Sequence, residues 1–485
     1  MVEKRIQNTI LDRSPNENNA LEVEGVGQEI EVPQPENTTK GYEIIQEEDG
    51  GVTLDFDPNQ KQSEGDYFAN LAEFMEGDML EKLSSDLQKN FEDDKNSRSD
   101  WEKTYKDGLD LLGFKYEERS KPFAGAAGVT HPLLAEAVTQ FQAQAYKELL
   151  PPGGPVRTEI MGTPSLEVEQ QAERIKEFMN YQITCEMQEF DPELDQMLFH
   201  LPLAGSAFKK VYYDGTLERA VSKFVPAEDL VVPYFITDLE SCGRITHIVK
   251  MKHNDLRKNQ VSGFYRDIEL SPNTANPSDI KEKQDELSGV EQISFAEEEH
   301  NVLEMHVDLD LPGFEDMGAN NKKTGIMLPY IVTLDEDSGE ILSIYRNWNQ
   351  GDPLRKKKEY FTHFKFLPGL GFYGFGLIHM LGGLSRTATA ALRQLVDAGT
   401  LSNLPAGFKA RGLRIRDDDE AINPGEWRDV DAPGGNLRES LMPLPYKEPS
   451  ATLFQLLGFV VDAGRRFAGV ADMMMGENAG SQQQP

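Results

Sequence analysis

Gly369, Gly371 and Gly374 spell the pattern G-x-G-x-x-G, between an apolar, aromatic run and a long helical pattern. In dinucleotide-binding folds such a loop brings the backbone close to a pyrophosphate, and an acidic residue ends the following parallel strand. Asp397 has a suitable spacing, but it falls inside the helical pattern, and no strand pattern follows within reach. We therefore expect a strand-to-helix hinge, because glycine adopts dihedral angles closed to other residues. The expected hinge residues are Gly369, Gly371, Gly374 and Gly376.

Three acidic stretches have compositions that could hold a metal ion. Segments 55–60 and 334–340 resemble calcium loops, but the first lacks glycine at its sixth position and the second has no flanking helices. The acids in 416–420 follow one another directly, so in an extended chain their side chains point to alternating sides. All three are better explained as solvated turns or loops, and no metal site is predicted.

The remaining candidates for chemistry also lack the necessary spacing. His300 and His306 lie on one face of an alternating strand pattern, but at about 3.3 Å per residue they are roughly 20 Å apart and cannot share a metal. Ser385 lacks the glycines of a nucleophile elbow, and there is no P-loop sequence. We predict no catalytic, cofactor-binding or metal-binding residue, and we do not expect an enzyme.

The overall composition sets limits on these interpretations. The chain has 485 residues, of which 38% are hydrophobic, and a mean hydropathy of −0.53, which indicates long exposed parts. Its formal net charge is −34, so it would be repelled by bulk DNA and by anionic membranes. No apolar run is long enough for a transmembrane helix. The N-terminus lacks the apolar region of a secretory signal, and the two cysteines favour a reducing compartment.

The first part of the chain has the composition of a disordered segment. Residues 1–66 are rich in Glu, Asn, Gln and Pro and show no sustained period. Residues 1–100 contain 25 acidic and 9 basic residues, a net charge of −16 that is nearly half of the total. We expect a disordered acidic segment over 1–66, and folded structure from about 67.

The body of the chain predicts an α+β fold. Residues from 67 to about 205 carry helical patterns, and residues from about 208 to 365 carry short β-branched and aromatic runs separated by turns. One pair of runs reads as a hairpin around Asp337-Ser338-Gly339. These patterns predict helices followed by mostly antiparallel sheet.

Two long amphipathic helices are expected near the end, over 376–403 and 450–469, with a short β-like piece over 404–449 between them. The first carries an apolar stripe and a separate polar stripe, and Ser450 is the expected N-cap of the second. Two helices joined by a distal β module cannot bury such stripes against each other alone. Packing beside copies of themselves would do so, which suggests a ring. The polar stripe contains Arg386, Thr389, Arg393 and Asp397.

Five stretches of the chain are distinctive in order and wording: GVTHPLLAEAVTQFQAQAYKELLPPGGPV (128–156), LPLAGSAFKKVYYD (201–214), VPAEDLVVPYFITDLESCGRITH (225–247), FLPGLGFYGFGLIHMLGGLSRTATAALRQLVDAGTLSNLPAGF (366–408) and GVADMMMGENAGS (469–481). They resemble the portal proteins, or head-to-tail connectors, of tailed double-stranded DNA phages, and above all those of short-tailed phages. The resemblance covers roughly 100–485, and no single motif in it is catalytic.

The resemblance implies a portal fold with a helical and antiparallel-β wing, a two-helix stem and a small clip that contains β structure. The wing would span 67–375, the first stem helix 376–403, the clip 404–449 and the second stem helix 450–469. Residues 470–485 would begin the tunnel loop that lies against DNA. Because family members continue into a further wing helix and a crown, we expect the chain to be truncated. The candidate channel residues are Met473, Met474, Met475, Glu477 and Asn478, and the candidate stem polar face is Arg386, Arg393 and Asp397.

The function implied by the resemblance is mechanical. Portal subunits form a homo-oligomeric ring, usually a dodecamer, at one capsid vertex of the virion, after assembly in the host bacterial cytoplasm. The ring nucleates capsid assembly with scaffold protein, docks the large terminase subunit and binds a head-tail adaptor. Double-stranded DNA passes through it during packaging and ejection without sequence specificity, and no cofactor or membrane is involved. An acidic channel suits sliding, because it holds DNA by few counterion-releasing contacts.

Two alternatives remain open. One is another virion protein, such as a different head-tail adaptor, although the paired helices around 404–449 disfavour it. The other is a nucleotide-binding enzyme that uses Gly369–Gly374, which would require a βαβ unit around this loop.

Overall fold

The computed structural model divides the chain into two units, Met1–Gln60 and Lys61–Pro485, each described here by itself. In the first unit, β1 (Glu43–Gln46) pairs antiparallel with β2 (Val52–Asp55). This pair forms within the segment expected to be disordered, whose other residues lie outside the described part. The structure describes residues 43–46, 52–55, 67–215, 217–270, 278–290, 299–317, 322–403, 407–409, 414–415, 430–431, 441–443 and 446–474.

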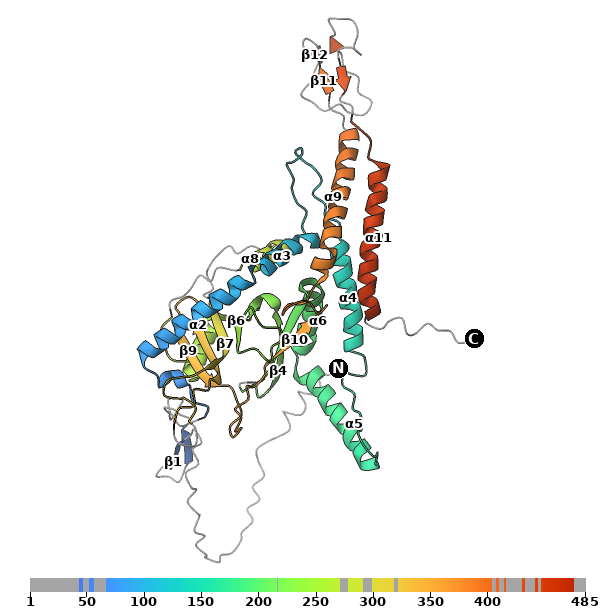
Figure 1. Ribbon diagram of the computed structural model, residues 1–485. Helices are drawn as coiled ribbons and strands as arrows, with labels where there is room; N and C mark the ends of the chain where they lie inside the picture. Colours follow the sequence, from blue (N-terminus) through green and yellow to red (C-terminus); the bar gives the residue numbers. More distant parts are fainter. Residues whose placement is uncertain are drawn as a thin grey trace, which may run out of the picture. The chain divides into compact units, whose positions relative to one another are not determined.

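The second unit begins with helices, as the sequence predicts (Figure 1). Gly113, with φ of 72°, ends the helical run that follows α3, because this left-handed conformation suits glycine. Ser165 caps α5 by accepting a hydrogen bond from the Val168 backbone N–H. The helices are α2 (Gly77–Ser97), α3 (Ser99–Leu109), α4 (Leu133–Leu149), α5 (Leu166–Tyr181) and α6 (Phe190–Ala204).

Two antiparallel sheets follow, which confirms the α+β class. The first has the order β10-β3-β4, and the second has the order β5-β6-β7-β8-β9. Gly339, with φ of 71°, lies in the turn between β8 and β9, where the sequence predicts a hairpin. The strands are β3 (Ser206–Asp214), β4 (Arg219–Pro226), β5 (Leu230–Val231), β6 (Arg244–Lys252), β7 (Glu299–Leu309), β8 (Leu328–Asp335), β9 (Ile341–Arg346) and β10 (Phe361–Lys365).

The largest hydrophobic core lies between α2 and the five-stranded sheet. Leu80, Leu87 and Phe91 recur at helical spacing along one face of α2 and are buried against the sheet. Two shorter helices, α7 (His253–Val261) and α8 (Asp279–Ser288), follow β6. Ile280 of α8 joins a second core beside α3, so this short helix is also held by apolar contacts.

The chain ends in two long helices joined by short strands. The helix expected over 376–403 is α9 (Leu377–Asn403), and the helix expected over 450–469 is α11 (Ala451–Met474), which extends beyond its predicted end. Ser450 caps α11 as expected, through its hydroxyl and the Leu453 backbone N–H at 3.4 Å. In the intervening part, β11 (Gly407–Lys409) pairs with β14 (Leu441–Pro443), and β12 (Arg414–Ile415) pairs with β13 (Val430–Asp431).

A charged cluster joins the two sheets. Lys210 Nζ of β3 lies 2.6 Å from both carboxylate oxygens of Glu304 on β7, and Nε2 of His306 lies 2.8 Å from Glu304 Oε1. Burial alone would raise the pKa of Glu304, but Lys210 and His306 outweigh it and hold that pKa well below its usual range. Glu304 therefore stabilises the fold above its unfolded-state pKa, and this contribution is lost as the pH falls.

Three buried histidines make the fold sensitive to mild acid. Burial lowers the pKa of His200 to about 4 and the pKa values of His247 and His363 to about 3. Unfolded histidines titrate near 6.5, so the unfolded chain binds more protons below that pH. Asp229 acts in the opposite direction, because burial raises its pKa to about 6. Burial also raises the pKa values of Glu228, Asp308 and Glu336, so these acids offset part of the effect of the histidines.

Lowering the pH from 7.5 to 5 is therefore expected to reduce the free energy of unfolding by about 2–5 kcal/mol. Urea denaturation at the two pH values, followed by tryptophan fluorescence, measures the difference. His247→Asn should flatten the pH dependence, because it removes one of the three groups. A stability that is constant or higher at pH 5 would contradict neutral, buried histidines.

Candidate functional site

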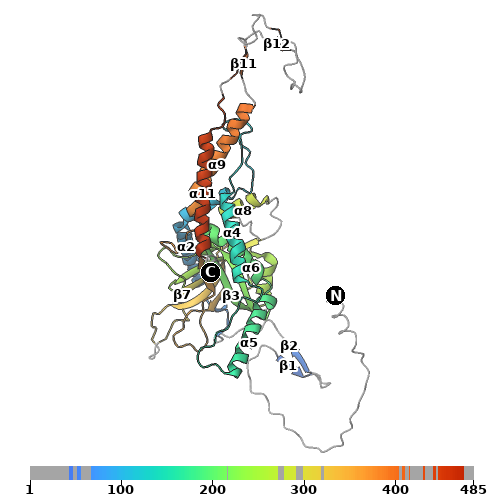
Figure 2. The ribbon, with the colours of Figure 1, turned by 90° about the vertical axis from the view of Figure 1, so that its right-hand side faces the viewer.

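Helices α9 and α11 lie side by side, and α11 also contacts α4 (Figures 1 and 2). The stripe expected on α9 is buried within the single chain at Leu381 and Ala388, and the stripe expected on α11 is nearly buried at Val460, so these positions do not need a second copy to cover them. Phe467, the last residue of the stripe expected on α11, is exposed instead. Gly464 permits a close approach, since a Cβ atom there would lie 2.5 Å from a methyl group of Leu133 on α4. The two helices are thus held as a pair against α4.

A second apolar face of α11 is left uncovered by the described residues. Leu456, Phe459 and Phe467 are 46%, 70% and 49% exposed. They follow one another at helical spacing, with Ala463 between the last two, along a flank of the helix that borders the buried stripe, since Phe467 lies two turns after Val460. Large apolar side chains exposed in a row mark an interaction surface more often than a solvated one.

The glycine-rich loop before α9 crosses the end of α6 at close range. A Cβ atom on Gly374 would lie 2.4 Å from the carbonyl oxygen of Gly205, and one on Gly376 would lie 2.3 Å from that of Leu203. Gly205 itself has φ of 89° and ends α6. The Gly374 backbone N–H donates to Ser206 Oγ at 2.8 Å. The base of α9 is therefore fixed by backbone-to-backbone contact with the α6–β3 junction.

This geometry changes the reason for the glycines in the predicted hinge. None of Gly369, Gly371, Gly374 and Gly376 is among the left-handed glycines of the described residues. Gly374 and Gly376 serve close approach, whereas Gly371 faces open space. The preceding strand, β10, is antiparallel to β3, and α9 leads to short antiparallel strands, so the described part of this region contains no βαβ unit. The described residues therefore lack the unit that a dinucleotide-binding loop requires.

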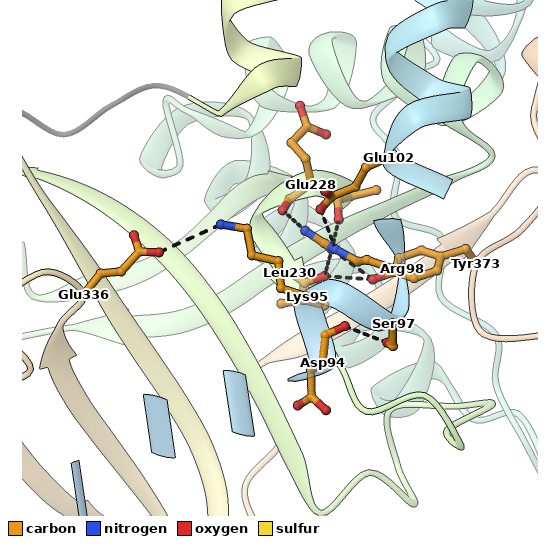
Figure 3. A network of polar contacts seen from close by, with 10 residues as sticks. Asp94, Lys95, Ser97, Arg98, Glu102, Glu228, Leu230, Glu336 and Tyr373 are labelled. Carbon is orange, nitrogen blue, oxygen red and sulfur yellow. Dashed lines mark hydrogen bonds and ion pairs between the residues drawn. The ribbon is translucent and has the colours of Figure 1, made fainter. Parts of the chain in front are cut away.

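Arg98, between α2 and α3, connects the same loop to the sheets (Figure 3). Its side chain is 4% exposed, and Nε donates to Glu102 Oε1 at 2.9 Å. Its guanidinium also donates to the hydroxyl of Tyr373 at 2.9 Å and to the carbonyl oxygen of Leu230 at 2.8 Å. The carbonyl oxygens of Ala227 and Glu228 accept from it as well. One buried cation thus links α3, the β4–β5 turn and the loop that precedes α9.

Aromatic rings complete this connection. Trp101 stacks on Tyr373 with ring centroids 4.6 Å apart, and on Tyr105 at 5.6 Å. The guanidinium of Arg98 lies 5.7 Å from the Trp101 ring and 5.9 Å from the Tyr373 ring, within the range of a cation–π contact. Arg98 could not be found from the sequence, because it lies in a polar run between two helices and no local pattern marks it.

The predicted polar face of α9 divides in the structure. Arg393 donates to the Val129 carbonyl oxygen at 2.7 Å and to Glu117 at 2.9 Å, and Asp397 accepts from the Ala127 N–H at 2.7 Å. Both residues therefore hold the segment 113–131 against α9. Arg386 lines the same hollow as Arg393 and Asp397, but it is exposed and has no polar partner among the described residues.

Replacing Asp397 with alanine is expected to free this segment without unfolding the protein. The Ala127 N–H loses its acceptor, and hydrogen exchange there should accelerate about tenfold, as expected for the loss of one hydrogen bond. Exchange measured by mass spectrometry on peptides covering 113–131 tests this. Gln394→Ala, which truncates an exposed neighbour on α9, is the matched control, and equal acceleration in both variants would contradict the assignment.

The candidate channel residues fall mostly outside the described part. Met473 and Met474 are the last two residues of α11. The helix therefore continues into positions where a tunnel loop was expected to begin. Met475, Glu477 and Asn478 lie outside the described residues, as do most residues of 404–449. Within the described ranges, no group of three His, Cys, Asp or Glu residues could hold a metal ion, and no helix is long and apolar enough to span a membrane.

Comparison with known proteins does not identify a family for this chain. No protein-family model and no curated protein matches this chain. The interpretation of the site therefore depends on its own geometry: a helix pair fixed at its base by glycines and by Arg98, with an apolar face left open on α11.

Proposed function

We propose that this chain is a subunit of a phage portal, a ring that forms a channel for double-stranded DNA at one capsid vertex. The observation that carries the proposal is the open face of α11. A helix that already packs against α9 and α4 still exposes Leu456, Phe459 and Phe467. Copies of the helix pair placed side by side would cover this face in every subunit, and a heterologous contact of this kind gives a ring when the rotation between subunits closes.

The charge of the chain supports a conduit for DNA. At −34 per subunit, a ring of about twelve copies is strongly electronegative and would release few counterions from a passing duplex. DNA would therefore slide through without sequence-specific contacts. The proposed role is mechanical, with genome packaging inward and ejection outward, and nucleotide hydrolysis belongs to the terminase that docks on the ring.

The proposed partners follow from the same assignment. The segment 404–449, between α9 and α11, would form the clip that binds the terminase and later the head-tail adaptor. The wing would contact capsid or scaffold protein, and the ring would reside in the virion after assembly in the bacterial cytoplasm. A different head-tail adaptor is the second candidate, favoured only if the chain assembles on a preformed ring and forms none itself. A nucleotide-binding enzyme is disfavoured, because β10 is antiparallel to β3.

Purified protein is expected to form rings of about twelve subunits, visible by negative-stain electron microscopy and weighed by mass photometry. Phe459→Glu should abolish the rings but leave the thermal unfolding midpoint unchanged, because the side chain is exposed in the single chain. Gln394→Glu, which adds the same charge to the exposed polar side of α9, is the control and should assemble normally. A wild-type chain that stays monomeric and binds nucleotide would overturn the proposal.

A further inference from the structure

Helix α5 is amphipathic, yet none of its residues is buried. It continues into a π-helical turn, Gln182–Glu186, and both views place it beyond the ends of α4 and α6 (Figures 1 and 2). Two hydrogen bonds between the Asn180 amide and the backbone of Val156 tie down its C-terminal end. A helix of this length is marginal in water unless its apolar face is covered.

Four of the apolar residues of α5 follow a heptad pattern, and the others, Leu166, Phe178 and Tyr181, lie outside it and are exposed. Val168, Ala172, Ile175 and Met179 are separated by four, three and four residues, which is the alternating spacing of the core positions in a two-helix coiled coil. Val168, Ile175 and Met179 are 40%, 45% and 42% exposed. The pattern therefore predicts another helix as the partner, rather than a flat sheet or a small ligand.

The charges beside this seam are self-complementary. Glu169 and Lys176 occupy equivalent positions one heptad apart, each directly after a core residue. If a second α5 lies antiparallel, Val168 of each copy meets Met179 of the other, and Ala172 meets Ile175. Glu169 of each copy then lies beside Lys176 of the other, so a single arrangement forms two opposite-charge pairs.

We infer that α5 docks on α5 of a second copy of this chain as an antiparallel helix pair. Lys176 is free to take part, since its ion pair with Glu173 in the single chain, at 3.0 Å, is solvent-exposed and contributes little. The contact has a twofold axis, so it does not depend on the proposed ring. Where rings form, it would join two of them, and the many weak contacts would act together.

Charge reversal tests the arrangement on the full-length chain. Sedimentation velocity over a range of concentrations measures association of single subunits, or of rings if they form. Glu169→Lys and Lys176→Glu are each expected to weaken this association about fivefold, because each replaces two attractive pairs by repulsive ones. The double variant, which restores opposite charges, should regain most of the wild-type affinity. Glu177→Lys, on the side of the helix away from the seam, is the matched control and should leave the affinity unchanged.

Ile175→Glu provides an independent test of the seam and should abolish the association, since a charge would enter its centre. All of these residues except Lys176 are exposed in the single chain, so the variants should fold, and circular dichroism confirms it. A double variant no tighter than the single ones would overturn the antiparallel arrangement and favour a different partner surface. Wild-type protein that shows no such association would overturn the inference. Ring formation in the same samples reports separately on the proposed function.

Discussion

Replacing Arg98 with methionine is expected to lower the free energy of unfolding by about 3–5 kcal/mol, the range for breaking a buried charged network from one side. Methionine keeps much of the volume but leaves Glu102 without its cation and the carbonyl oxygens of Ala227, Glu228 and Leu230 without their shared donor. The stacking of Trp101 on Tyr373 also loses the guanidinium beside it. Urea denaturation measures the loss.

Lys103→Met is the matched control for this variant. Lys103 directly follows Glu102 on α3, but it is exposed, so the same change of charge should alter stability by less than about 0.5 kcal/mol. Similar losses in both variants would show that removing a positive charge, rather than breaking the buried network, destabilises the protein. Hydrogen exchange at the base of α9 should rise only in the Arg98 variant, because Tyr373 directly precedes the glycines that launch this helix.

Gly376→Ala is expected to have the second largest effect. It should lower the free energy of unfolding by about 3 kcal/mol, the upper end for overpacking, because the new Cβ meets backbone atoms that cannot rotate away. The new Cβ would lie 2.3 Å from the Leu203 carbonyl oxygen and 2.6 Å from the Gly205 nitrogen. The α6–β3 junction and the start of α9 must then separate. Gly371→Ala, in the same loop but facing open space, should be nearly neutral.

Thermal unfolding of the two glycine variants shows whether the glycines are needed for loop flexibility or for close backbone approach. If flexibility of the loop were the important property, both alanines would act alike, because both restrict the backbone equally. If close approach is the important property, only Gly376→Ala lowers the midpoint. In the proposed ring, the same variant should also reduce assembly, since α9 would leave the body at a different angle.

The sequence predicts the elements of this chain better than it predicts their connections. The α+β class, both long helices, the Ser450 cap and the hairpin at Gly339 follow from local signals: hydrophobic period, capping chemistry and turn residues. The end of α11 was placed too early, because the predicted stop at residue 469 is a glycine that the helix passes through.

For the site residues too, the sequence indicates some of the residues but not their partners. Arg393 and Asp397 were recognised as a polar stripe, but their partners lie in a segment more than 260 positions away, and no period reveals such a pairing. Arg98 was missed for the same reason, since its acceptors are backbone carbonyls distant in sequence. The glycines of 369–376 were noticed for their spacing, but their close approach to Gly205 and Leu203 depends on tertiary packing alone.

The double fixation of the α9 base has a mechanical consequence. The helix is anchored at one end by the glycine crossing and, through Tyr373, by Arg98, whereas Asp397 and Arg393 brace it farther along against the segment 113–131. A helix that is anchored at its base and held from the side transmits an applied force to the rest of the fold instead of bending. A push at the far ends of α9 and α11 would therefore reach the two sheets as torque at residues 371–376.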